Sequence, residues 1–404
     1  MVALAVVATV GCTGELSGAD PGATPHSGTG GAGVGGSGNV GGTGPAGGGT
    51  GGDDTTTNPT PGTGGRGGAG GGEPVEPPAG SIPMFVAQGH AGRTTVSCDD
   101  GHTWVADKSN DDSILCFEEG FDCDHDAGAG RGITWGDGWF YATFGWGTPG
   151  DVRRSDDGVD WETVLSGTTF GGVAYGNGRL VAANRPARYS DDQGVTWMNA
   201  GDSDLTVWTL RGAGFAPTHG GRFVMAASGG IAEITVSADG HTWSQPESSP
   251  ADCGDGIQTD GGIVYRNGTI VAMGSTAVAC RSTDGGATWT SSAIGGSITS
   301  QLVFSGGQFM VWGNGTLYRS TDGVTWTTTP LSPANLNLGP VAVSDSGTFV
   351  GVKGGWLVSY DKQAFYRSAD GVTWETLPGS AFDGSHPIRF ISFGYGKRSA
   401  ACPD

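Results

Sequence analysis

The sequence predicts an all-β protein, a seven-bladed β-propeller of four-stranded blades preceded by a disordered segment. Three observations predict this fold. A turn motif recurs seven times, alternating apolar runs lie ahead of the copies, and no segment keeps the 3.6-residue period of a helix. Evenly repeated short strands separated by turn residues are typical of propeller blades.

The first 80 residues differ in composition from the other 324. Residues 13–80 contain no Phe, Trp or Tyr, and 27 of these 68 residues are Gly. Such a stretch has too little apolar surface to offset the entropy of ordering it, so we expect a disordered linker. All 13 Trp lie in residues 81–404, where we place the propeller.

Residues 1–12 are small and apolar and end at Cys12. Thr9-Val10-Gly11-Cys12 resembles a bacterial lipobox, although that family prefers Leu where Thr9 stands and no Lys or Arg precedes the apolar run. Eleven apolar residues are too few to span a bilayer. The resemblance implies a signal segment, lipidation at Cys12 and an outer-membrane lipoprotein of the cell envelope, with plain secretion as the alternative.

The repeated motif reads Ser-x-Asp-(x)-Gly-x-Thr-Trp or a close variant. Three copies have eight residues, and four lack one residue of the turn. The copies are 97–104, 155–161, 190–197, 237–243, 282–289, 320–326 and 368–374. The Asp accepts backbone hydrogen bonds, the Gly provides positive φ, and the Trp begins the next strand.

Each copy contributes one such Asp, whereas a catalytic group is needed once. We therefore interpret these residues as structural and not as catalytic or calcium-binding. They are Asp99, Asp157, Asp192, Asp239, Asp284, Asp322 and Asp370.

The motif resembles the Asp-box, or bacterial neuraminidase repeat. The resemblance implies a propeller with its boxes on one face and its ligand site among the loops of the other. Sialidases of this family use three arginines and carry an Arg-Ile-Pro motif near the first blade. This chain has Ser81-Ile82-Pro83 there, and Arg131 and Arg185 complete no triad, so sialidase activity is disfavoured.

The spacing of the copies gives the number of blades. The interval averages about 45 residues, and the two ends of residues 81–404 together supply about one more period, which favours seven blades over six or eight. The first copy has no inner strand ahead of it. Residues 389–396 (RFISFGYG) have the pattern of that strand, so we expect the C-terminal strand to close the ring.

The largest departure from the repeat is an insertion near 107–130, within an interval of 58 residues. Its acidic and aromatic character suits a sugar-binding surface. The ligand-binding hypothesis names Glu118, Asp124, His125, Asp126, Trp146 and Arg185. The neighbouring Trp135, Trp139 and Phe140 are interpreted as blade core, whereas Trp146 remains open between the two roles.

Asp122, Asp124 and Asp126 are spaced as at the start of a calcium loop, but the expected Gly is Ala127 and the twelfth position is Ile133. Calcium is therefore a weak candidate, and we expect no cofactor. Apart from Cys12, six cysteines suggest three disulfides in an exported domain. Of the 15 possible pairings, we hypothesise Cys116–Cys123, Cys253–Cys280 and Cys98–Cys402.

The formal net charge of −20 makes nucleic acid an improbable partner. Two functions remain open. One is a monomeric surface module that binds a glycan or an extracellular protein without catalysis, held to the membrane only by its lipid. The other is a glycoside hydrolase, whose carboxylates would be sought among Asp112, Glu118, Asp124, Asp126 and Glu233.

Overall fold

A computed structural model of the chain describes thirteen segments, all within the compact unit Thr60–Asp404. They are residues 77–89, 92–108, 129–145, 150–167, 170–184, 186–201, 210–227, 234–250, 252–253, 262–273, 277–353, 364–377 and 388–403. Residues 1–76 and most of the insertion near 107–130 lie outside them.

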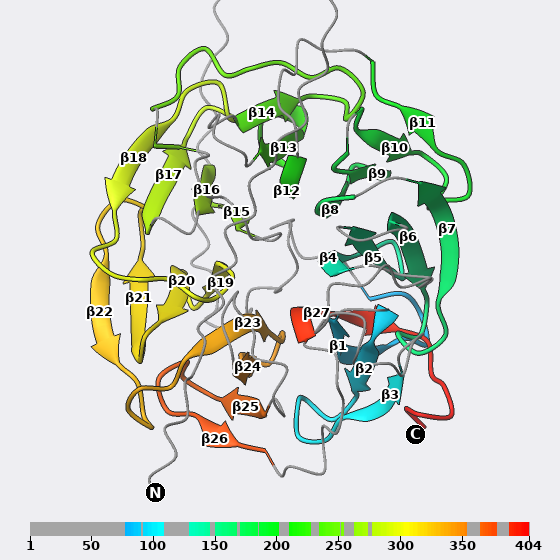
Figure 1. The fold of residues 1–404 in the computed structure, drawn as a ribbon, viewed down its shortest axis with the longest axis vertical. Helices are drawn as coiled ribbons and strands as arrows, with labels where there is room; N and C mark the ends of the chain where they lie inside the picture. The colour runs from blue at the N-terminus through cyan, green and yellow to red at the C-terminus, as the bar shows by residue number, and fades with distance from the viewer. Residues whose placement is uncertain are drawn as a thin grey trace, which may run out of the picture. The chain divides into compact units, whose positions relative to one another are not determined.

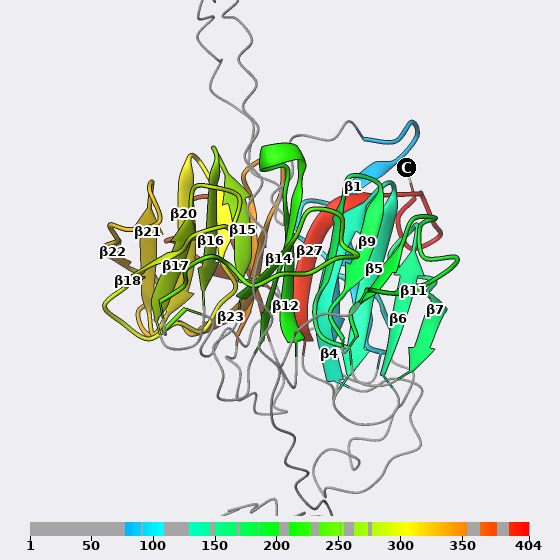
Figure 2. The ribbon, with the colours of Figure 1, turned by 90° about the horizontal axis from the view of Figure 1, so that it is seen from above.

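The predicted fold is confirmed: seven antiparallel sheets form the blades of a β-propeller, arranged around a common axis (Figure 1). Seen from the side, the strands run roughly along that axis (Figure 2). Strands are given from the inside of each blade to its outer edge. Blade 1 contains β27 (Ile388–Gly396), β1 (Ile82–Gly89), β2 (Thr94–Ser97) and β3 (Val105–Lys108). Blade 2 contains β4 (Ala129–Gly136), β5 (Trp139–Gly145), β6 (Gly150–Ser155) and β7 (Glu162–Gly167).

The next three blades follow the same order. Blade 3 contains β8 (Val173–Gly176), β9 (Arg179–Ala182), β10 (Arg188–Ser190) and β11 (Met198–Asn199). Blade 4 contains β12 (Leu210–Ala216), β13 (Arg222–Ala227) and β14 (Ile234–Ser237), with a bridge between Val236 and Ser244 at the outer position. Blade 5 contains β15 (Ile263–Arg266), β16 (Thr269–Met273), β17 (Val278–Ser282) and β18 (Thr290–Ala293).

The last two blades complete the ring. Blade 6 contains β19 (Val303–Ser305), β20 (Gln308–Gly313), β21 (Thr316–Ser320) and β22 (Thr327–Pro330). Blade 7 contains β23 (Leu338–Val343), β24 (Phe349–Lys353), β25 (Phe365–Ser368) and β26 (Glu375–Thr376). The described residues contain a 3-10 turn at Thr218–Gly220 and one further residue in 3-10 conformation, Gly92.

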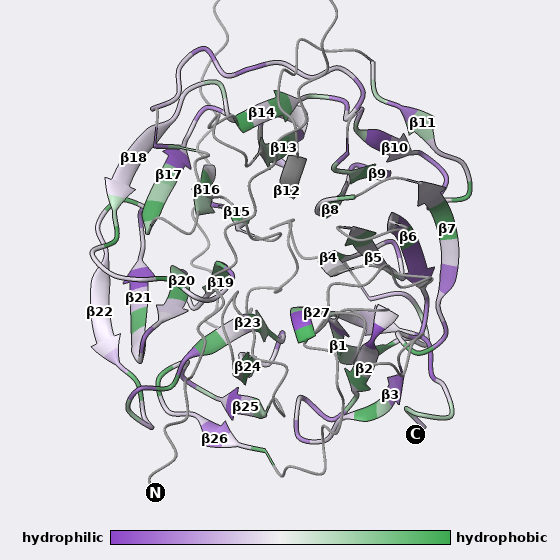
Figure 3. Cartoon of the chain, in the orientation of Figure 1, coloured by the Kyte–Doolittle hydropathy of each residue, from purple (hydrophilic) through white to green (hydrophobic). Residues whose placement is uncertain are grey.

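The apolar residues pack between blades. A separate cluster fills each junction; between blades 3 and 4, for example, Val181 and Ala174 meet Phe223 and Met225. The middle strands are therefore apolar on both faces, while outer strands such as β22 and β26 are more hydrophilic (Figure 3). Burying both faces of each sheet is what stabilises a ring of such short strands.

The seven motif copies form the turn that joins the third strand of each blade to its outer strand; we call these the repeat turns. In the sixth, the carboxylate of Asp322 accepts hydrogen bonds from the Ser320 hydroxyl and from the backbone N–H groups of Val324 and Thr325. The backbone N–H of Thr325, followed by that of Val324, lowers the pKa of Asp322 to about 2. The other six aspartates accept equivalent bonds, so each carboxylate is used inside its own turn.

Arginines tie each of several blades to the repeat turn of the next blade. The arginine just before the motif Ser donates to the carbonyl just before the motif Gly of the neighbour. The pairs are Arg154 to Gln193 (2.6 Å), Arg319 to Asp370 (3.3 Å) and Arg367 to Asp100 (2.9 Å). In blade 3 that position is Tyr189, and Arg179 lies over its ring and donates to Asp239 instead.

Glycines let the inner strands approach one another around the axis. A Cβ at Gly394 would lie 2.3 Å from the ring of Trp135, and one at Gly176 would lie 2.1 Å from the ring of Phe215. Aromatic side chains of one blade thus fill the space left by a glycine of the blade before it. The aromatic residue fills the space beside the preceding blade, and the small residue next to it leaves space for the following blade. Trp135-Gly136 in β4 and Tyr175-Gly176 in β8 are examples.

The C-terminal strand closes the ring, as the sequence predicted. β27 pairs antiparallel with β1 from Ile82 opposite Gly396 to Gly89 opposite Ile388. Cys98 and Cys402 form a disulfide beside this pairing.

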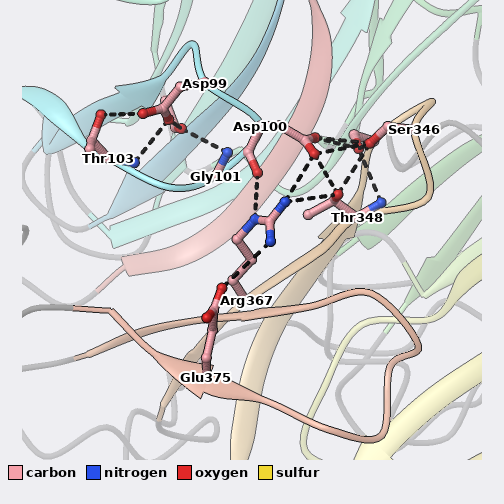
Figure 4. Close-up of polar contacts among 10 residues, drawn as sticks. Asp99, Asp100, Gly101, Thr103, Ser346, Thr348, Arg367 and Glu375 are labelled. Atoms are coloured by element: carbon pink, nitrogen blue, oxygen red, sulfur yellow. Dashed lines mark hydrogen bonds and ion pairs between the residues drawn. The ribbon is translucent and has the colours of Figure 1, made fainter.

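Polar contacts join blade 7 to blade 1 (Figure 4). The Asp100 carboxylate accepts hydrogen bonds from Ser344 (2.7 Å), Ser346 (3.1 Å), Thr348 (2.5 Å) and Arg367 (3.2 Å). The four donors all come from blade 7. They saturate the carboxylate and hold the last blade to the first.

Candidate functional site: a polar cavity between the first two blades

A cavity of about 470 Å³ lies between blades 1 and 2, near their outer strands. Its size is within the range of small-molecule sites, about 300–1,000 Å³. Blade 1 contributes Gly92, Thr94 and Lys108, and blade 2 contributes Asp151, Arg153, Val159, Asp160, Trp161, Thr163 and Ser166. Thr94, Lys108, Asp151 and Ser166 lie at strand ends away from the repeat turns, whereas residues 159–161 belong to the second repeat turn.

A buried ion pair forms one wall. The Nε of Arg153 donates to the Oδ2 of Asp151 at 2.8 Å, and the two side chains are only 7% and 4% exposed. The guanidinium also lies 5.0 Å from the centre of the Phe144 ring. Both charges come from β6, two residues apart, so they point to the same side of the strand.

A second ion pair crosses the gap nearer to solvent. Lys108 of β3 contacts Asp160 of the second repeat turn at 3.0 Å, and both side chains are more than half exposed. Their mutual contribution to stability is small, as it is for most exposed pairs. The pair nevertheless leaves the cavity with an ammonium and a carboxylate at its mouth.

Hydroxyl groups complete the lining. Thr94 is 4% exposed and opens onto the cavity, and its hydroxyl makes no hydrogen bond to any other residue in the described segments. Thr163 and Ser166 of β7 face the same space. The Thr94 hydroxyl is therefore open to a molecule in the cavity and can both donate a hydrogen bond to it and accept one from it.

This arrangement is suited to binding. Both lining carboxylates contact a cation: Asp151 contacts Arg153, and Asp160 contacts Lys108. Within the described segments, no group of three or more His, Cys, Asp or Glu is arranged to hold a metal ion. The site offers hydrogen-bond donors and acceptors at fixed positions.

The six residues of the ligand-binding hypothesis all lie outside the described residues, as do the calcium candidates and the Cys116–Cys123 pair. They are Glu118, Asp124, His125, Asp126, Trp146 and Arg185, with Asp122 for calcium. The described chain stops at Lys108 and resumes at Ala129, so the insertion leaves blade 1 from a residue that lines the cavity.

The aromatic cluster of blade 2 serves as core. Phe140 is fully buried, Trp135 donates to the Tyr395 carbonyl at 2.8 Å, and Trp139 packs under Arg154. The interpretation of these three residues as packing is therefore confirmed.

Two disulfides are present among the described cysteines, Cys98–Cys402 and Cys253–Cys280. They are two of the three pairs hypothesised from the sequence. Disulfides persist in oxidising compartments, so they favour a location outside the cytoplasm. Within the described segments, no helix has the length and apolar character needed to cross a bilayer.

Neither a protein-family model nor a curated protein matches the sequence. Solved propellers match the fold. YCF48 from Cyanidioschyzon merolae is 18% identical over 66% of this chain and 95% of its own, with a TM-score of 0.46. The GH74 enzyme of Niastella koreensis is 17% identical over 66% of this chain and 42% of its own, with a TM-score of 0.46. Apo AztD from Citrobacter koseri is 10% identical over 78% and 99%, with a TM-score of 0.48.

The similarity of the chain to these proteins is one of fold. They include a protein solved with a bound peptide, YCF48 with a D1 peptide, and a GH74 enzyme. At this level of identity the activity of one propeller says nothing about that of another.

Proposed function

We propose that this chain is an exported, lipid-anchored propeller of the Asp-box family that binds a glycan or an extracellular protein and does not catalyse a reaction on it. The observation that carries the proposal is the cavity between blades 1 and 2. Its buried carboxylate Asp151 is bound to the Arg153 guanidinium, and the Thr94 hydroxyl opens onto the cavity. Such a site can recognise a ligand through hydrogen bonds.

The assignment to the Asp-box family is supported by the bonding of the repeat turns. In each copy the motif Ser hydroxyl donates to the motif Asp and accepts from the backbone N–H of the motif Gly, as at Ser320, Asp322 and Gly323. The same groups are used seven times, which gives the motif Ser, Asp and Gly a structural role and leaves ligand binding to other residues.

The anchor is proposed to be a lipid on Cys12, with residues 13–80 as a flexible linker. The disulfides support export. Metabolic labelling with an alkyne fatty acid tests the anchor. We expect label on the wild-type chain and none on Cys12→Ser; equal labelling of both would refute the anchor.

The binding function is tested with a glycan array and a parallel hydrolysis assay on the same oligosaccharides. We expect a bound subset that is released unchanged and a monomer by light scattering. Turnover of any oligosaccharide would instead establish the glycoside hydrolase, with its carboxylates sought among Asp112, Glu118, Asp124, Asp126 and Glu233.

The residues of the insertion and nearby loops are proposed to add contacts to the same ligand. Alanine variants of His125, Trp146 and Arg185 should weaken array binding, as should variants of Glu118, Asp124 and Asp126. Glu247→Ala is the matched control, because Glu247 is exposed and belongs to neither the cavity nor the insertion. If all six variants bound the array as the wild type does, the hypothesis that these residues contact the ligand would be wrong.

A further inference from the structure

We infer that the cavity between blades 1 and 2 is a binding site for one neutral, polyhydroxylated sugar ring. The inference rests on the proposed function and narrows it to a place and a ligand class. Three features carry it: irregular strand pairing in both walls, a charge pair found in one repeat alone, and the neutral balance of the lining.

Both walls of the cavity contain a β-bulge. Six blades have a described pairing between the third and the outer strand, and only two of these pairings shift register: β2 with β3, and β6 with β7. On β3 the irregularity includes Ala106 at φ 54°, a left-handed conformation uncommon for a residue with a side chain. Bulges redirect side chains and are frequent beside functional sites.

The bulges bring polar side chains to the cavity wall. Residues opposite each other in an antiparallel pair point to the same face of the sheet. Because of the shift on β3, Lys108 is opposite Thr94. Because Val164 is the extra residue of β7, Thr163 is opposite Arg153 and Ser166 is opposite Asp151. In regular strands, residues 163 and 166 would lie on different faces.

The Asp151–Arg153 pair is a departure from the repeat. Asp151 lies four residues and Arg153 two residues before the motif Ser155. No other repeat has an acid and a base at these two positions. In blade 6 the same positions are Thr316 and Tyr318, and Tyr318 belongs to the apolar cluster between blades 5 and 6. Blade 1 has a different pair, in which Arg93 contacts Asp107 of the next strand. A buried ion pair is seldom more stabilising than apolar packing, so the acid and base side by side on one strand of blade 2 point to ligand recognition.

The lining selects an uncharged ligand rich in hydroxyls. Among the described residues, its charged members are Lys108, Asp151, Arg153 and Asp160, two of each sign, which form two ion pairs. An ionised ligand would add a charge that neither of these pairs compensates. Sugar hydroxyls both donate and accept, and so can bond to the paired groups and to Thr94 alike. Trp161, half-buried at the repeat turn, offers an aromatic face to the apolar side of a ring.

The test measures binding of simple sugars to the full chain carrying Cys12→Ser, folded under oxidising conditions. Saturation-transfer NMR is recorded with methyl β-glucopyranoside, methyl β-galactopyranoside and N-acetylglucosamine, and with the charged analogues glucuronate and glucosamine. We expect at least one neutral sugar to bind with a dissociation constant at or below about 10 mM. The charged analogue of that sugar should bind at least about tenfold more weakly.

Two variants test whether the sugar binds in the cavity. Thr94→Val keeps the shape of the side chain and removes the hydroxyl, so affinity should fall about threefold to tenfold. Ser166→Trp fills the cavity from its exposed strand and should abolish binding. Thr329→Val on the outer strand β22 is the matched control and should bind as the wild type does.

Each other result overturns the inference. Equal binding by wild type, Thr94→Val and Ser166→Trp would place the sugar elsewhere, and no binding of any neutral sugar would exclude the ligand class. A peptide library whose binding is lost in Ser166→Trp would make the cavity a peptide site. If Ser166→Trp still binds the glycan array, the proposed function stands without this cavity; if the wild type binds nothing there, the proposed function itself fails.

Discussion

Opening the disulfide that spans the ring should destabilise the protein more than opening the disulfide inside blade 5. The perturbation is the double variant Cys98→Ser/Cys402→Ser, and its control is Cys253→Ser/Cys280→Ser. The first pair is separated by 304 residues and the second by 27. A disulfide restricts the unfolded chain more strongly when the loop it closes is longer.

The loop lengths give the magnitudes. In the chain-entropy treatment, the ring disulfide contributes about 5.7 kcal/mol and the blade 5 disulfide about 3.6 kcal/mol, a difference of about 2 kcal/mol. At about 2.1 cal/mol/K of unfolding entropy per residue, a propeller of this size would lose about 8 °C and about 5 °C in Tm, respectively. Local packing losses do not account for a larger effect in the ring variant, because Cys253, Cys280 and Cys402 are almost fully buried whereas Cys98 is only partly buried.

Urea unfolding followed by tryptophan fluorescence measures both free energies by linear extrapolation. The β1–β27 pairing remains in the ring variant, so its native fold should persist and the loss should be in stability alone. If the two double variants lost equal stability, or the blade 5 variant lost more, restriction of the unfolded ring would not be the source of the stabilisation.

Three further perturbations test the contacts between blades and within the turns. Gly176→Ala should lower the free energy of unfolding by about 1–3 kcal/mol, because the new Cβ would meet a phenyl ring at 2.1 Å, whereas Gly167→Ala, with its nearest contact at 3.7 Å, should change little in the same urea titration. Arg367→Met should lower the Tm more than Arg319→Met in calorimetry, because Arg367 bonds to both a carbonyl and a carboxylate of blade 1 while Arg319 bonds to one carbonyl; equal shifts would contradict this. The pKa of Asp322 is lowered to about 2, so its stabilising effect is present above about pH 4 and is lost as the pH falls toward 2; Asp322→Asn should flatten the dependence of stability on pH across that interval, and parallel curves would refute it.

The fold could be predicted because its signals are local and repeated. Each repeat turn needs its Ser, Asp and Gly within a few residues, so seven copies counted in the sequence indicated seven blades. The C-terminal strand could be assigned to the first blade because residues 389–396 share the aromatic and glycine pattern of other inner strands. Both predictions are confirmed.

The cavity was missed because it depends on register. The register shifts at Ala106 and Val164 determine which side chains face the cavity. An extra residue in a short outer strand produces no local sequence pattern from which it could be predicted. One signal was available: the second repeat is the only one with an acid and a base together at the positions four and two residues before the motif Ser, Asp151 and Arg153. The sequence instead drew attention to the insertion, whose residues lie outside the described structure.

The buried ion pair of blade 2 is expected to lower the stability of the protein while it contributes to ligand binding. This can be tested by replacing the pair with the residues that blade 6 has at the same positions. The double variant Asp151→Thr/Arg153→Tyr replaces the buried ion pair by the residues of Thr316 and Tyr318. Replacing a buried pair by packed side chains is often neutral or stabilising by about 1–4 kcal/mol, whereas removing one partner costs about 3–5 kcal/mol.

The double variant should therefore unfold at the same urea concentration as the wild type or at a higher one, and Asp151→Thr alone at a lower one. At the same time the double variant should lose the neutral sugar, because the cavity loses its paired donor and acceptor. If Asp151→Thr/Arg153→Tyr were as unstable as Asp151→Thr alone, the ion pair would be needed for the stability of the fold. Its occurrence in only one repeat would then not indicate ligand binding. If the double variant were more stable than the wild type and no longer bound the sugar, blade 2 would retain a destabilising ion pair because ligand binding requires it.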